Sequence, residues 1–484
     1  MIDPILAALD ADTTSAAAAE ITSLVVAYLD ATRDTDGPVS TSLTSAQIAA
    51  RFDEPLPLDG ASLAHVAARL RDDVMSDCNR LFHPRAMGHQ VSPPLPAAIW
   101  TEALIGALNQ SVAVAEMSPT ATVMEHRVVR WMCELAGYGA GSGGTLTSGG
   151  TEATLTALLA ARSATIPDVW TNGVGANPPV VVCGEHTHYA VARAVGELGI
   201  GMRNVVTIPS RDFRMDTAAL KTALDRLQSE GRAVMAVVAT AGSTATGSFD
   251  DLETIGILCD VRGLWLHIDG AHGASALLSS RQRGRLRGLA RARSIAWDPH
   301  KMMLLPLAAG LVLVRDERDL ESAFSQRAPY LFHGAEGERS WDQGTRSFQC
   351  SRRADVIKLW VALQRYGADG IGALYDRLCD LAMAMHDMLV EHPSFEVLHE
   401  PEGNILCFRW IGNGSLGDEA LDVVNRDLRD RYNRSGAGWV TATNLGGRRV
   451  LRVTIMNPRT TVGDVRAVMN GLAGEADKIP TSAS

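Results

Sequence analysis

Residues 264–272 have the sequence LWLHIDGAH, in which a short apolar run ends at Asp269. Similar runs precede it, separated by stretches with helical spacing: VVVC at 180–183, NVVTI at 204–208 and VMAVVAT at 234–240. Continuous apolar strands that alternate with helices are typical of a parallel sheet covered on both faces. We therefore predict an α/β domain in which Asp269 lies at the carboxyl edge of the sheet, where such sheets bind ligands.

The chain on either side of this sheet predicts two further parts. From Pro4 to Arg71 the apolar residues recur at helical spacing, which predicts an N-terminal helical arm over residues 1–90. A Pro-rich turn at 92–96 then opens the large domain, predicted over 91–370, with a first helix from Ala97 to Val114. The runs NILCFRW and RVLRVTI, at 404–410 and 449–455, predict antiparallel strands in a small α+β domain over 371–484.

Composition limits the class of protein. The 484 residues are 46% hydrophobic and 21% charged, which is a globular composition without the signature of disorder. A formal charge of −10 disfavours nucleic acid as a partner, because the field would repel phosphates.

Compartment and membrane association can also be predicted. Seven scattered cysteines without a CxxC motif favour reduced thiols and a cytoplasmic protein. The first residues carry acids instead of a basic export signal. The most apolar window, at 303–314, is too short to cross a bilayer, so we predict a buried strand there and no membrane association.

Several residues in the large domain suggest chemistry. The segment TLTSGGTEATLTALLAAR, at 145–162, predicts a strand, a Gly-Gly turn and a helix whose free amides could hold a phosphate with Ser148 and Thr151. A helix entry built from small residues without a ligand is the alternative. No GK[ST] element follows, so this is not a Walker sequence.

Lys301 lies 32 residues after Asp269, within WDPHKMMLLP at 297–306. A lysine beside such an apolar run either extends its amine to solvent or takes part in chemistry. Histidines 186, 188, 267 and 272 could suggest a metal site. We predict no metal, because alternate strand positions point to opposite faces and the four rings need not converge.

The order of these features resembles the group II pyridoxal-phosphate decarboxylases, which include glutamate, aromatic-amino-acid and 2,4-diaminobutyrate decarboxylases. The phosphate-binding turn, a histidine after the next strand, the strand-end aspartate and the lysine follow one another as in that family. Further segments match, among them FHPRAMGHQ at 82–90, SRRADVIKLW at 351–360 and LRVTIMNP at 451–458. The resemblance runs from about residue 60 to near 470, and HIDGAHG with DPHK is its most specific part.

The resemblance implies the aspartate aminotransferase fold (fold type I of pyridoxal-phosphate enzymes) and a carboxy-lyase that decarboxylates an L-amino acid. Lys301 would form a Schiff base with the cofactor aldehyde. Asp269 would keep the pyridine nitrogen protonated, and His188 would stack on the ring. The remaining cofactor contacts implied are Gly150, Thr151, Ser294 and His300 at the phosphate, with Thr240 and Ala271 near the ring.

The resemblance also implies substrate contacts. Tyr330 would return a proton to the substrate carbon, and Arg452 would receive the α-carboxylate. His89 and Gln90 give the pocket a polar rim, which indicates a polar substrate of the glutamate, aspartate or 2,4-diaminobutyrate type, with aromatic amino acids still open. The family forms homodimers with shared active sites, in which the N-terminal arm wraps the partner.

Some alternatives stay open from sequence. An aminotransferase or carbon–sulfur lyase would need the same aspartate and lysine, and a non-catalytic homologue would only bind a partner. Asp298 stands where the family more often has Asn or Ala, and we predict that it is peripheral to the chemistry. The arginine-rich segment 281–293 either contacts an anion or is a solvated loop or helix.

Overall fold

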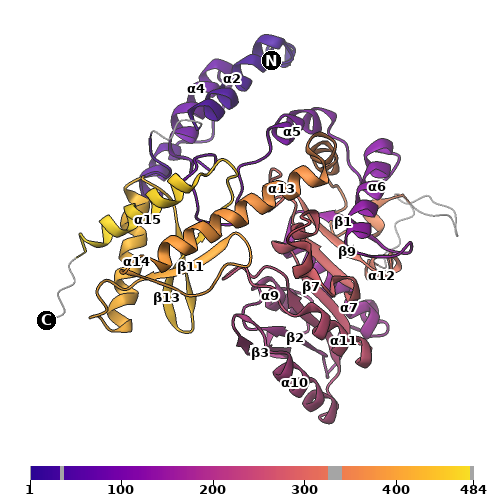
Figure 1. Ribbon diagram of the computed structural model, residues 1–484. Helices are drawn as coiled ribbons and strands as arrows, with labels where there is room; N and C mark the ends of the chain where they lie inside the picture. Colours follow the sequence, from indigo (N-terminus) through magenta and orange to yellow (C-terminus); the bar gives the residue numbers. More distant parts are fainter. Residues whose placement is uncertain (1, 33–36, 325–340, 480–484) are drawn as a thin grey trace. The chain divides into compact units, whose positions relative to one another are not determined.

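The computed structural model describes residues 2–32, 37–324 and 341–479 (Figure 1). The chain separates into two compact units. Unit 1 comprises Met1–His89, Ala384–Leu398 and Cys407–Ser484, and unit 2 comprises Gln90–Met383 and His399–Leu406. The predicted division into an arm, a large domain and a small domain is a different partition of the chain, and it stays a prediction.

Unit 2 is built on a seven-stranded sheet with the order β1-β9-β8-β7-β6-β2-β3. Neighbours from β8 to β3 pair in parallel, whereas β9 is antiparallel to both β1 and β8. The fold type I architecture predicted from sequence, with a mainly parallel central sheet, is therefore confirmed. The strands are β1 (Gly143–Thr147), β2 (Val180–Gly184), β3 (Val205–Ile208), β6 (Val234–Thr240), β7 (Trp265–Asp269), β8 (Ser294–Trp297) and β9 (Gly310–Val314).

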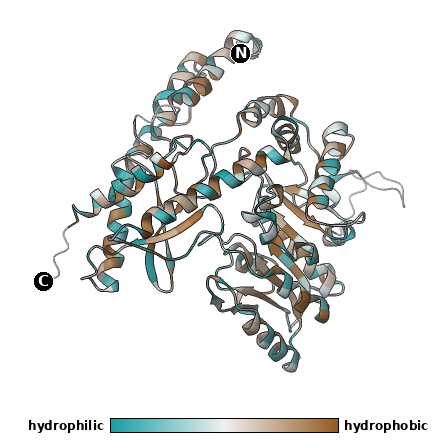
Figure 2. Ribbon diagram, viewed as in Figure 1, coloured by the Kyte–Doolittle hydropathy of each residue, from teal (hydrophilic) through white to brown (hydrophobic). Residues whose placement is uncertain are grey.

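Helices cover this sheet, and the strands between them are strongly hydrophobic (Figure 2). A core cluster joins Leu158 of α7 and Val195 of α9 to Val181 and Val238 of the sheet, all almost fully buried. Burial on both faces explains why the strands have continuous apolar sequences instead of alternating ones. The longer helices of unit 2 are α5 (Pro96–Leu108), α6 (Pro119–Leu135), α7 (Gly150–Thr165), α9 (Ala190–Glu197), α10 (Thr217–Ser229) and α11 (Leu252–Arg262). The segment α13 (Val356–Val390) consists of two helices that meet at a kink at Gly367, and it continues into unit 1.

The observed bounds of strands and helices agree with the sequence prediction in some places and differ in others. The strand predicted at 234–240 has the bounds of β6, and β9 lies inside the apolar window at 303–314. The helix predicted to reach Val114 instead ends at Leu108. Asn109 adopts a left-handed conformation there, with φ of 45°, and its N–H donates to the Ile105 carbonyl. This cap ends the helix six residues before the predicted end.

Unit 1 contains a four-stranded sheet with the order β10-β11-β13-β12. Two pairs of strands in this sheet are antiparallel, as predicted. They are β12 (Thr441–Leu445) with β13 (Arg448–Thr454), and β10 (Phe395–Val397) with β11 (Ile405–Trp410). Its helices are α1 (Ile2–Asp12), α2 (Ser15–Ala31), α3 (Ser45–Ala49), α4 (Leu63–Arg69), α14 (Asp418–Arg434) and α15 (Val462–Ala476).

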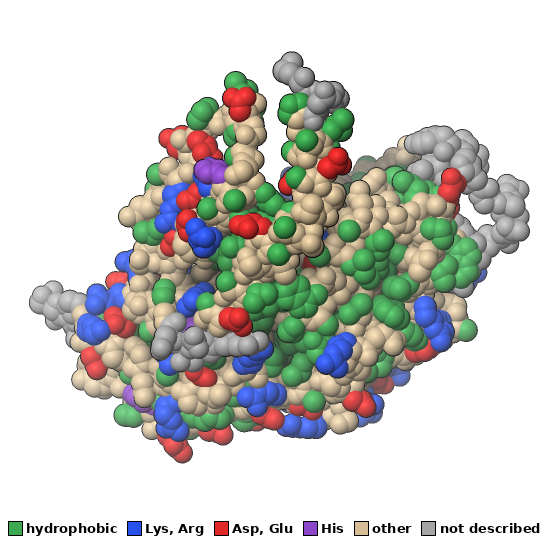
Figure 3. All heavy atoms as spheres, turned by 90° about the horizontal axis from the view of Figure 1, so that it is seen from above, with side chains coloured by type: hydrophobic (Ala, Val, Ile, Leu, Met, Phe, Trp, Pro, Cys, Tyr) green, Lys and Arg blue, Asp and Glu red, His purple; other side chains and the backbone are tan. Residues whose placement is uncertain are grey.

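The surface leaves hydrophobic side chains exposed in patches (Figure 3). On α5 of unit 2, Trp100, Leu104 and Leu108 are exposed at intervals of four residues, which places them on one helix face. In unit 1, the first helix exposes Ile5 and Leu9 in the same spacing. An exposed row of this kind is typical of an interaction surface.

The arginine-rich segment 281–293 is held by carboxylates of its own unit. Arg281 makes two hydrogen bonds to Asp380, and Arg293 makes two to Asp319. Arg291 contacts Glu253 and Asp260 in the same way. These intramolecular pairs account for much of the segment's charge without an external anion.

Candidate functional site

A cavity of about 410 Å³ lies within unit 2 at the carboxyl edge of the seven-stranded sheet. The loops that follow β1, β2, β6, β7 and β8 all contribute to it, because the carboxyl ends of parallel strands meet at one edge. Ten of the ligand-binding residues predicted from sequence line this cavity: Gln90, Ser148, Gly150, Thr151, His188, Thr240, Asp269, Ala271, His300 and Lys301.

Lys301 lies in a tight turn after β8. Its backbone N–H donates to the Asp298 carbonyl at 3.0 Å, and its side-chain Nζ lies 3.3 Å from Asp298 Oδ2. The Asp298 backbone is held in turn by Ala271, whose carbonyl accepts its N–H at 3.1 Å. The lysine side chain is 19% exposed, so its amine is enclosed yet reachable from the cavity.

Asp269 and Thr240 end neighbouring parallel strands and lie opposite each other in register. Asp269 is 8% exposed, and its Oδ1 accepts the Ala271 N–H at 3.2 Å. The Thr240 hydroxyl is buried and has no hydrogen-bond partner in the part of the chain that the structure describes. The backbone N–H of Thr240 donates to the side chain of Asp250, and burial raises the pKa of this carboxyl.

His188 enters the cavity from the loop after β2. Its pKa is lowered first by burial and further by Lys301, whereas Asp269 and Asp298 act in the opposite direction. Its Nδ1 accepts the Ala190 N–H at 3.3 Å, so a neutral ring carries its proton on Nε2. A neutral, partly buried imidazole is suited to stacking on an aromatic ring.

The turn before α7 forms a cradle of backbone amides. The helix begins at Gly150, and no side chain caps its N-terminus. A Cβ at Gly150 would lie 2.8 Å from the Ala271 Cβ and 3.0 Å from Asp298 Oδ2, and one at Gly149 would lie 3.0 Å from His300 Cε1. Only glycine fits this close approach, which leaves the amides open to an anion.

These groups fit pyridoxal phosphate. The cavity offers an amine for an aldehyde, a carboxylate for a ring nitrogen and an uncapped helix N-terminus for a phosphate. Residues 46–411 match the family model described as the pyridoxal-dependent decarboxylase conserved domain.

The chain belongs to the pyridoxal-dependent decarboxylase family.

Individual relatives agree with this assignment. The decarboxylase is 32% identical over 430 residues to the L-2,4-diaminobutyrate decarboxylase of Rhizobium meliloti, covering 88% of this chain and 85% of the relative. It is 28% identical over 426 residues to the L-aspartate decarboxylase of Metarhizium robertsii, covering 87% and 85%.

A solved structure has the same architecture. It is the glutamate decarboxylase domain of diaminobutyrate-pyruvate transaminase and L-2,4-diaminobutyrate decarboxylase from Vibrio parahaemolyticus, with a TM-score of 0.85, 27% identity and 97% coverage of both chains. The cofactor and the carboxy-lyase activity predicted from sequence are thus confirmed at the level of the family.

Ser294 is not brought to the cavity of the decarboxylase. It is fully buried at the first position of β8, and its hydroxyl accepts the Trp265 Nε1–H at 2.8 Å. The same hydroxyl lies 3.0 Å from His267 Nδ1. The predicted phosphate contact therefore conflicts with the geometry, because the cavity lies at the other end of this strand.

The predicted substrate residues are divided between the units. Gln90 lines the cavity of unit 2, whereas His89 and Arg452 belong to unit 1. Within unit 1 the pKa of His89 is lowered by burial and then by Arg452, and the His89 ring centroid lies 5.3 Å from that of Trp439. Tyr330 lies outside the described residues.

Several cavity residues were missed from sequence. Asp298 was expected at the periphery but lies against Lys301, and Glu152, Tyr189, Thr244 and His272 also line the cavity. Asp298 could have been found, because a residue three positions before a turn lysine shares its turn. Among the described residues, no group of three or more His, Cys, Asp or Glu is arranged to hold a metal ion.

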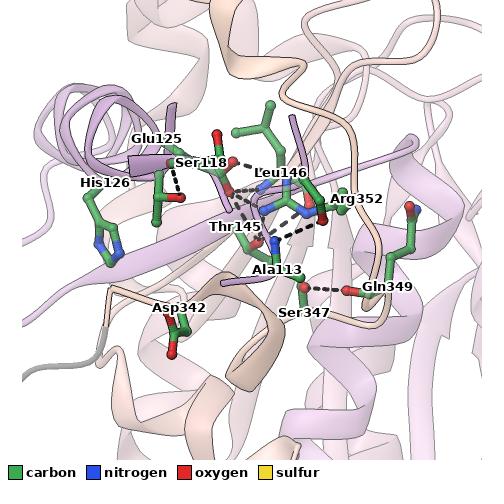
Figure 4. A network of polar contacts seen from close by, with 12 residues as sticks. Ala113, Ser118, Glu125, His126, Thr145, Leu146, Asp342, Ser347, Gln349 and Arg352 are labelled. Atoms are coloured by element: carbon green, nitrogen blue, oxygen red, sulfur yellow. Dashed lines mark hydrogen bonds and ion pairs between the residues drawn. The ribbon is translucent and has the colours of Figure 1, made fainter. Parts of the chain in front are cut away.

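A buried ion pair fixes the strand that leads into the cradle (Figure 4). Arg352 donates to both Glu125 oxygens, at 2.6 and 3.0 Å. Glu125 also accepts the Leu146 N–H of β1 at 3.1 Å and the Thr145 hydroxyl at 3.4 Å. Strand β1 of the decarboxylase is thereby joined to α6 and to the segment around Arg352 immediately before the Gly149–Gly150 turn.

Proposed function

We propose that the protein decarboxylates a small polar L-amino acid, with L-2,4-diaminobutyrate as the first expected substrate and L-aspartate as the second. The observation that carries this proposal is the convergence of Lys301 and Asp269 on one cavity beside an uncapped helix N-terminus. Membership of the pyridoxal-dependent decarboxylase family supports it independently.

Each residue then has a defined task. Lys301 would hold the cofactor through its amine, and Gly150, Thr151 and His300 would surround the phosphate. Asp269 would keep a proton on the pyridine nitrogen, because a nearby carboxylate favours the charged form. When bound, pyridoxal phosphate supplies an electron sink for the bond that breaks as carbon dioxide leaves.

The other residues would position the substrate and the proton. His188 would stack on the ring face, with Thr240 and Ala271 packed near the ring. We propose Arg452, His89 and Gln90 as substrate-binding residues, with Arg452 receiving the α-carboxylate. Tyr330 would return a proton to Cα after carbon dioxide departs, which favours simple decarboxylation over transamination.

The charge of the cavity favours a diamino acid over an acidic one. Glu152 lines the cavity, and its Oε1 is buried without a hydrogen-bond partner among the described residues. Its Oε2 accepts the Ser148 N–H at 2.8 Å. A second amine on the substrate would be attracted by the Glu152 carboxylate, whereas a second carboxylate would be repelled. The named activity of the Rhizobium meliloti relative supports the same order.

The Lys301→Ala variant tests the cofactor assignment. We expect it to lose turnover and the visible absorbance of bound pyridoxal phosphate, because no other amine would replace the lysine. Borohydride treatment of the wild-type protein should fix the cofactor on the peptide that contains Lys301, as measured by mass spectrometry. A yellow, fully active Ala variant would contradict the assignment.

The substrate is tested by measuring carbon dioxide release from the twenty common amino acids and L-2,4-diaminobutyrate. We expect the highest kcat/KM for L-2,4-diaminobutyrate. The Glu152→Gln variant should lower the preference for it over L-aspartate. Keto-acid formation or sulfide release without carbon dioxide would instead indicate an aminotransferase or a carbon–sulfur lyase.

We also propose that the protein is a cytoplasmic homodimer with shared active sites. The exposed apolar rows on α5 and on the N-terminal helix support a dimer, since burying them would remove them from water. The seven cysteines are free, which supports a reducing compartment. Among the described residues no helix is long and apolar enough to span a bilayer. A monomer by light scattering at micromolar concentration would contradict the dimer.

A further inference from the structure

Glu152 is the third residue of α7, and its carboxylate lines the cavity without a cation beside it. Its Oε2 accepts two hydrogen bonds, from the Ser148 N–H at 2.8 Å and from Gln349 Nε2 at 2.9 Å. Neither donor is charged, and no Lys, Arg or His in the described part of the chain forms an ion pair with Glu152. The negative charge of this side chain is therefore held in place by two neutral donors on one oxygen.

A glutamate at this position of a helix commonly binds the helix N-terminus itself. In the capping-box arrangement, the third residue accepts the backbone N–H of the N-cap residue, which in α7 is Gly149. Here Oε2 accepts the N–H of Ser148 instead, one residue earlier. The N–H groups of Gly149 and Gly150 have no hydrogen-bond partner among the described residues. The positive end of the helix dipole therefore stays open towards the cavity.

The phosphate of the cofactor would need the same open amides. A Glu152 carboxylate that moved onto the Gly149 N–H would satisfy the helix N-terminus, and its charge would repel the phosphate. The chain therefore contains a competitor of its own ligand at the third position of α7. Phosphate binding depends on what keeps this carboxylate on the Ser148 N–H.

Gln349 is anchored where it can hold Glu152 in this position. The Gln349 carbonyl accepts the Ser347 hydroxyl at 2.9 Å, and three residues later Arg352 is fixed by its buried pair with Glu125 (Figure 4). The backbone is thus held on both sides of the Gln349 amide. Gln349 does not itself line the cavity, so any effect that it has on a ligand passes through Glu152.

We propose that Gln349 is a positioning residue for cofactor binding, which holds the Glu152 carboxylate on the Ser148 N–H and away from the amides that receive the phosphate. The inference rests on the proposed cofactor site. It assigns a role in cofactor affinity to a segment about 200 residues away from the cradle in sequence.

The test compares two ligands on the full-length protein freed of cofactor. Pyridoxal 5′-phosphate and pyridoxal share the ring and the aldehyde, and only the first has a phosphate. Gln349→Met keeps the length of the side chain but has no donor. We expect it to raise the Kd of pyridoxal 5′-phosphate by about tenfold, the effect of one hydrogen bond to a charged group, and to leave the Kd of pyridoxal unchanged. Absorbance titration measures both.

Two further variants in the same segment sharpen this comparison. Gln349→Glu nearly keeps the shape of the side chain, and it should raise the Kd of pyridoxal 5′-phosphate at least as much, because two carboxylates repel each other. Cys350→Ser changes the exposed neighbouring residue and should leave both Kd values at those of wild type.

Neutralising Glu152 separates competition with the phosphate from a purely structural role. Glu152→Gln keeps an oxygen for the Ser148 N–H but has no charge, so it should bind pyridoxal 5′-phosphate at least as tightly as wild type. Adding Gln349→Met to Glu152→Gln should then have no further effect, because no carboxylate remains to be held away. A residue that only stabilised the fold would weaken binding by the same factor in both backgrounds and for both ligands.

The outcomes separate this inference from the proposed function. Equal losses for pyridoxal 5′-phosphate and pyridoxal, or equal losses with and without the Glu152 charge, would overturn the role of Gln349 and leave the cofactor site intact. A Glu152→Gln variant that bound pyridoxal 5′-phosphate more weakly than wild type would also overturn it. Failure of the wild-type protein to bind pyridoxal 5′-phosphate would overturn the cofactor site and this inference together.

Discussion

Unit 2 buries two acidic side chains in contrasting ways. Glu125 is 0% exposed, and both of its oxygens accept hydrogen bonds from Arg352, with Leu146 and Thr145 completing the set. Asp298 is 2% exposed, yet one of its oxygens has no partner among the described residues. Burial removes both carboxylates from water, which is unfavourable for each. Among the described residues, only Glu125 has hydrogen bonds to both oxygens that offset this cost. A completed buried charge therefore supports the fold, whereas the incomplete one lies in the wall of the cavity beside Lys301.

The largest effect is expected from breaking the completed pair. Arg352→Ala would leave Glu125 buried without its main partner, and we expect a loss of about 3–5 kcal/mol in the free energy of unfolding. Urea denaturation followed by circular dichroism measures this. The double variant Glu125→Gln, Arg352→Met should recover part of the loss, because it removes both charges at similar volume. A single variant as stable as wild type would show that the pair is not structural.

At the cavity, the same kind of change should affect catalysis and not stability. Asp269→Asn keeps an oxygen for the Ala271 N–H but removes the charge expected beside the pyridine nitrogen. We expect kcat to fall by about 10²–10³-fold, the range for losing one preorganised electrostatic group. The urea midpoint of the cofactor-free protein should stay near that of wild type. An Asp269→Asn variant that unfolds more easily but retains its turnover would show that Asp269 serves stability instead of catalysis.

His267 tests an intermediate case, a buried and partly satisfied group in the core. Burial lowers the pKa of His267 to about 4 from an ordinary value of 6.5. As the pH falls through this window the unfolded chain takes up a proton that the folded protein does not. Stability should therefore fall with decreasing pH by about 3 kcal/mol between pH 6.5 and 4.

The matched variant for this effect is His267→Asn, which keeps a polar atom near the Ser294 hydroxyl. It costs stability at every pH through lost volume, so the comparison concerns only the slope with pH. Its stability should decline less steeply below pH 6.5 than that of wild type. Parallel declines would assign the acid sensitivity to other groups.

Much of this architecture was predictable because its signals are local. The strand β6 (Val234–Thr240) is a continuous apolar run, and the rule that ligands bind at the carboxyl edge brings Asp269 and Lys301 to one cavity. Whether another residue near these strands reaches the cavity depends on its position along the strand. Ser294 begins β8 and lies in the core, whereas Asp298 follows the end of β8 and reaches the cavity.

The remaining features depend on contacts far apart in sequence. Glu125 and Arg352 are 227 residues apart, and nothing in either segment indicates the other as its partner. The early end of α5 had a weak local signal in Asn109, since Asn tolerates a left-handed cap, but only the fold decides whether it is used. A sequence can thus suggest which charges are buried, but their partners have to be read from the structure.

The smallest effect is expected from an arginine pair with the same geometry on the surface. Arg281 donates to Asp380 at 2.6 and 3.0 Å, the two distances found between Arg352 and Glu125. Here, however, both side chains are more than half exposed, so water and salt screen the charges in the folded and unfolded chain alike. We therefore expect Arg281→Ala to leave the midpoint of urea denaturation unchanged within error, at low and at high salt. A loss as large as that of Arg352→Ala would mean that geometry, and not burial, determines what an arginine–carboxylate pair contributes, and the contrast between Glu125 and Asp298 would then lose its physical basis.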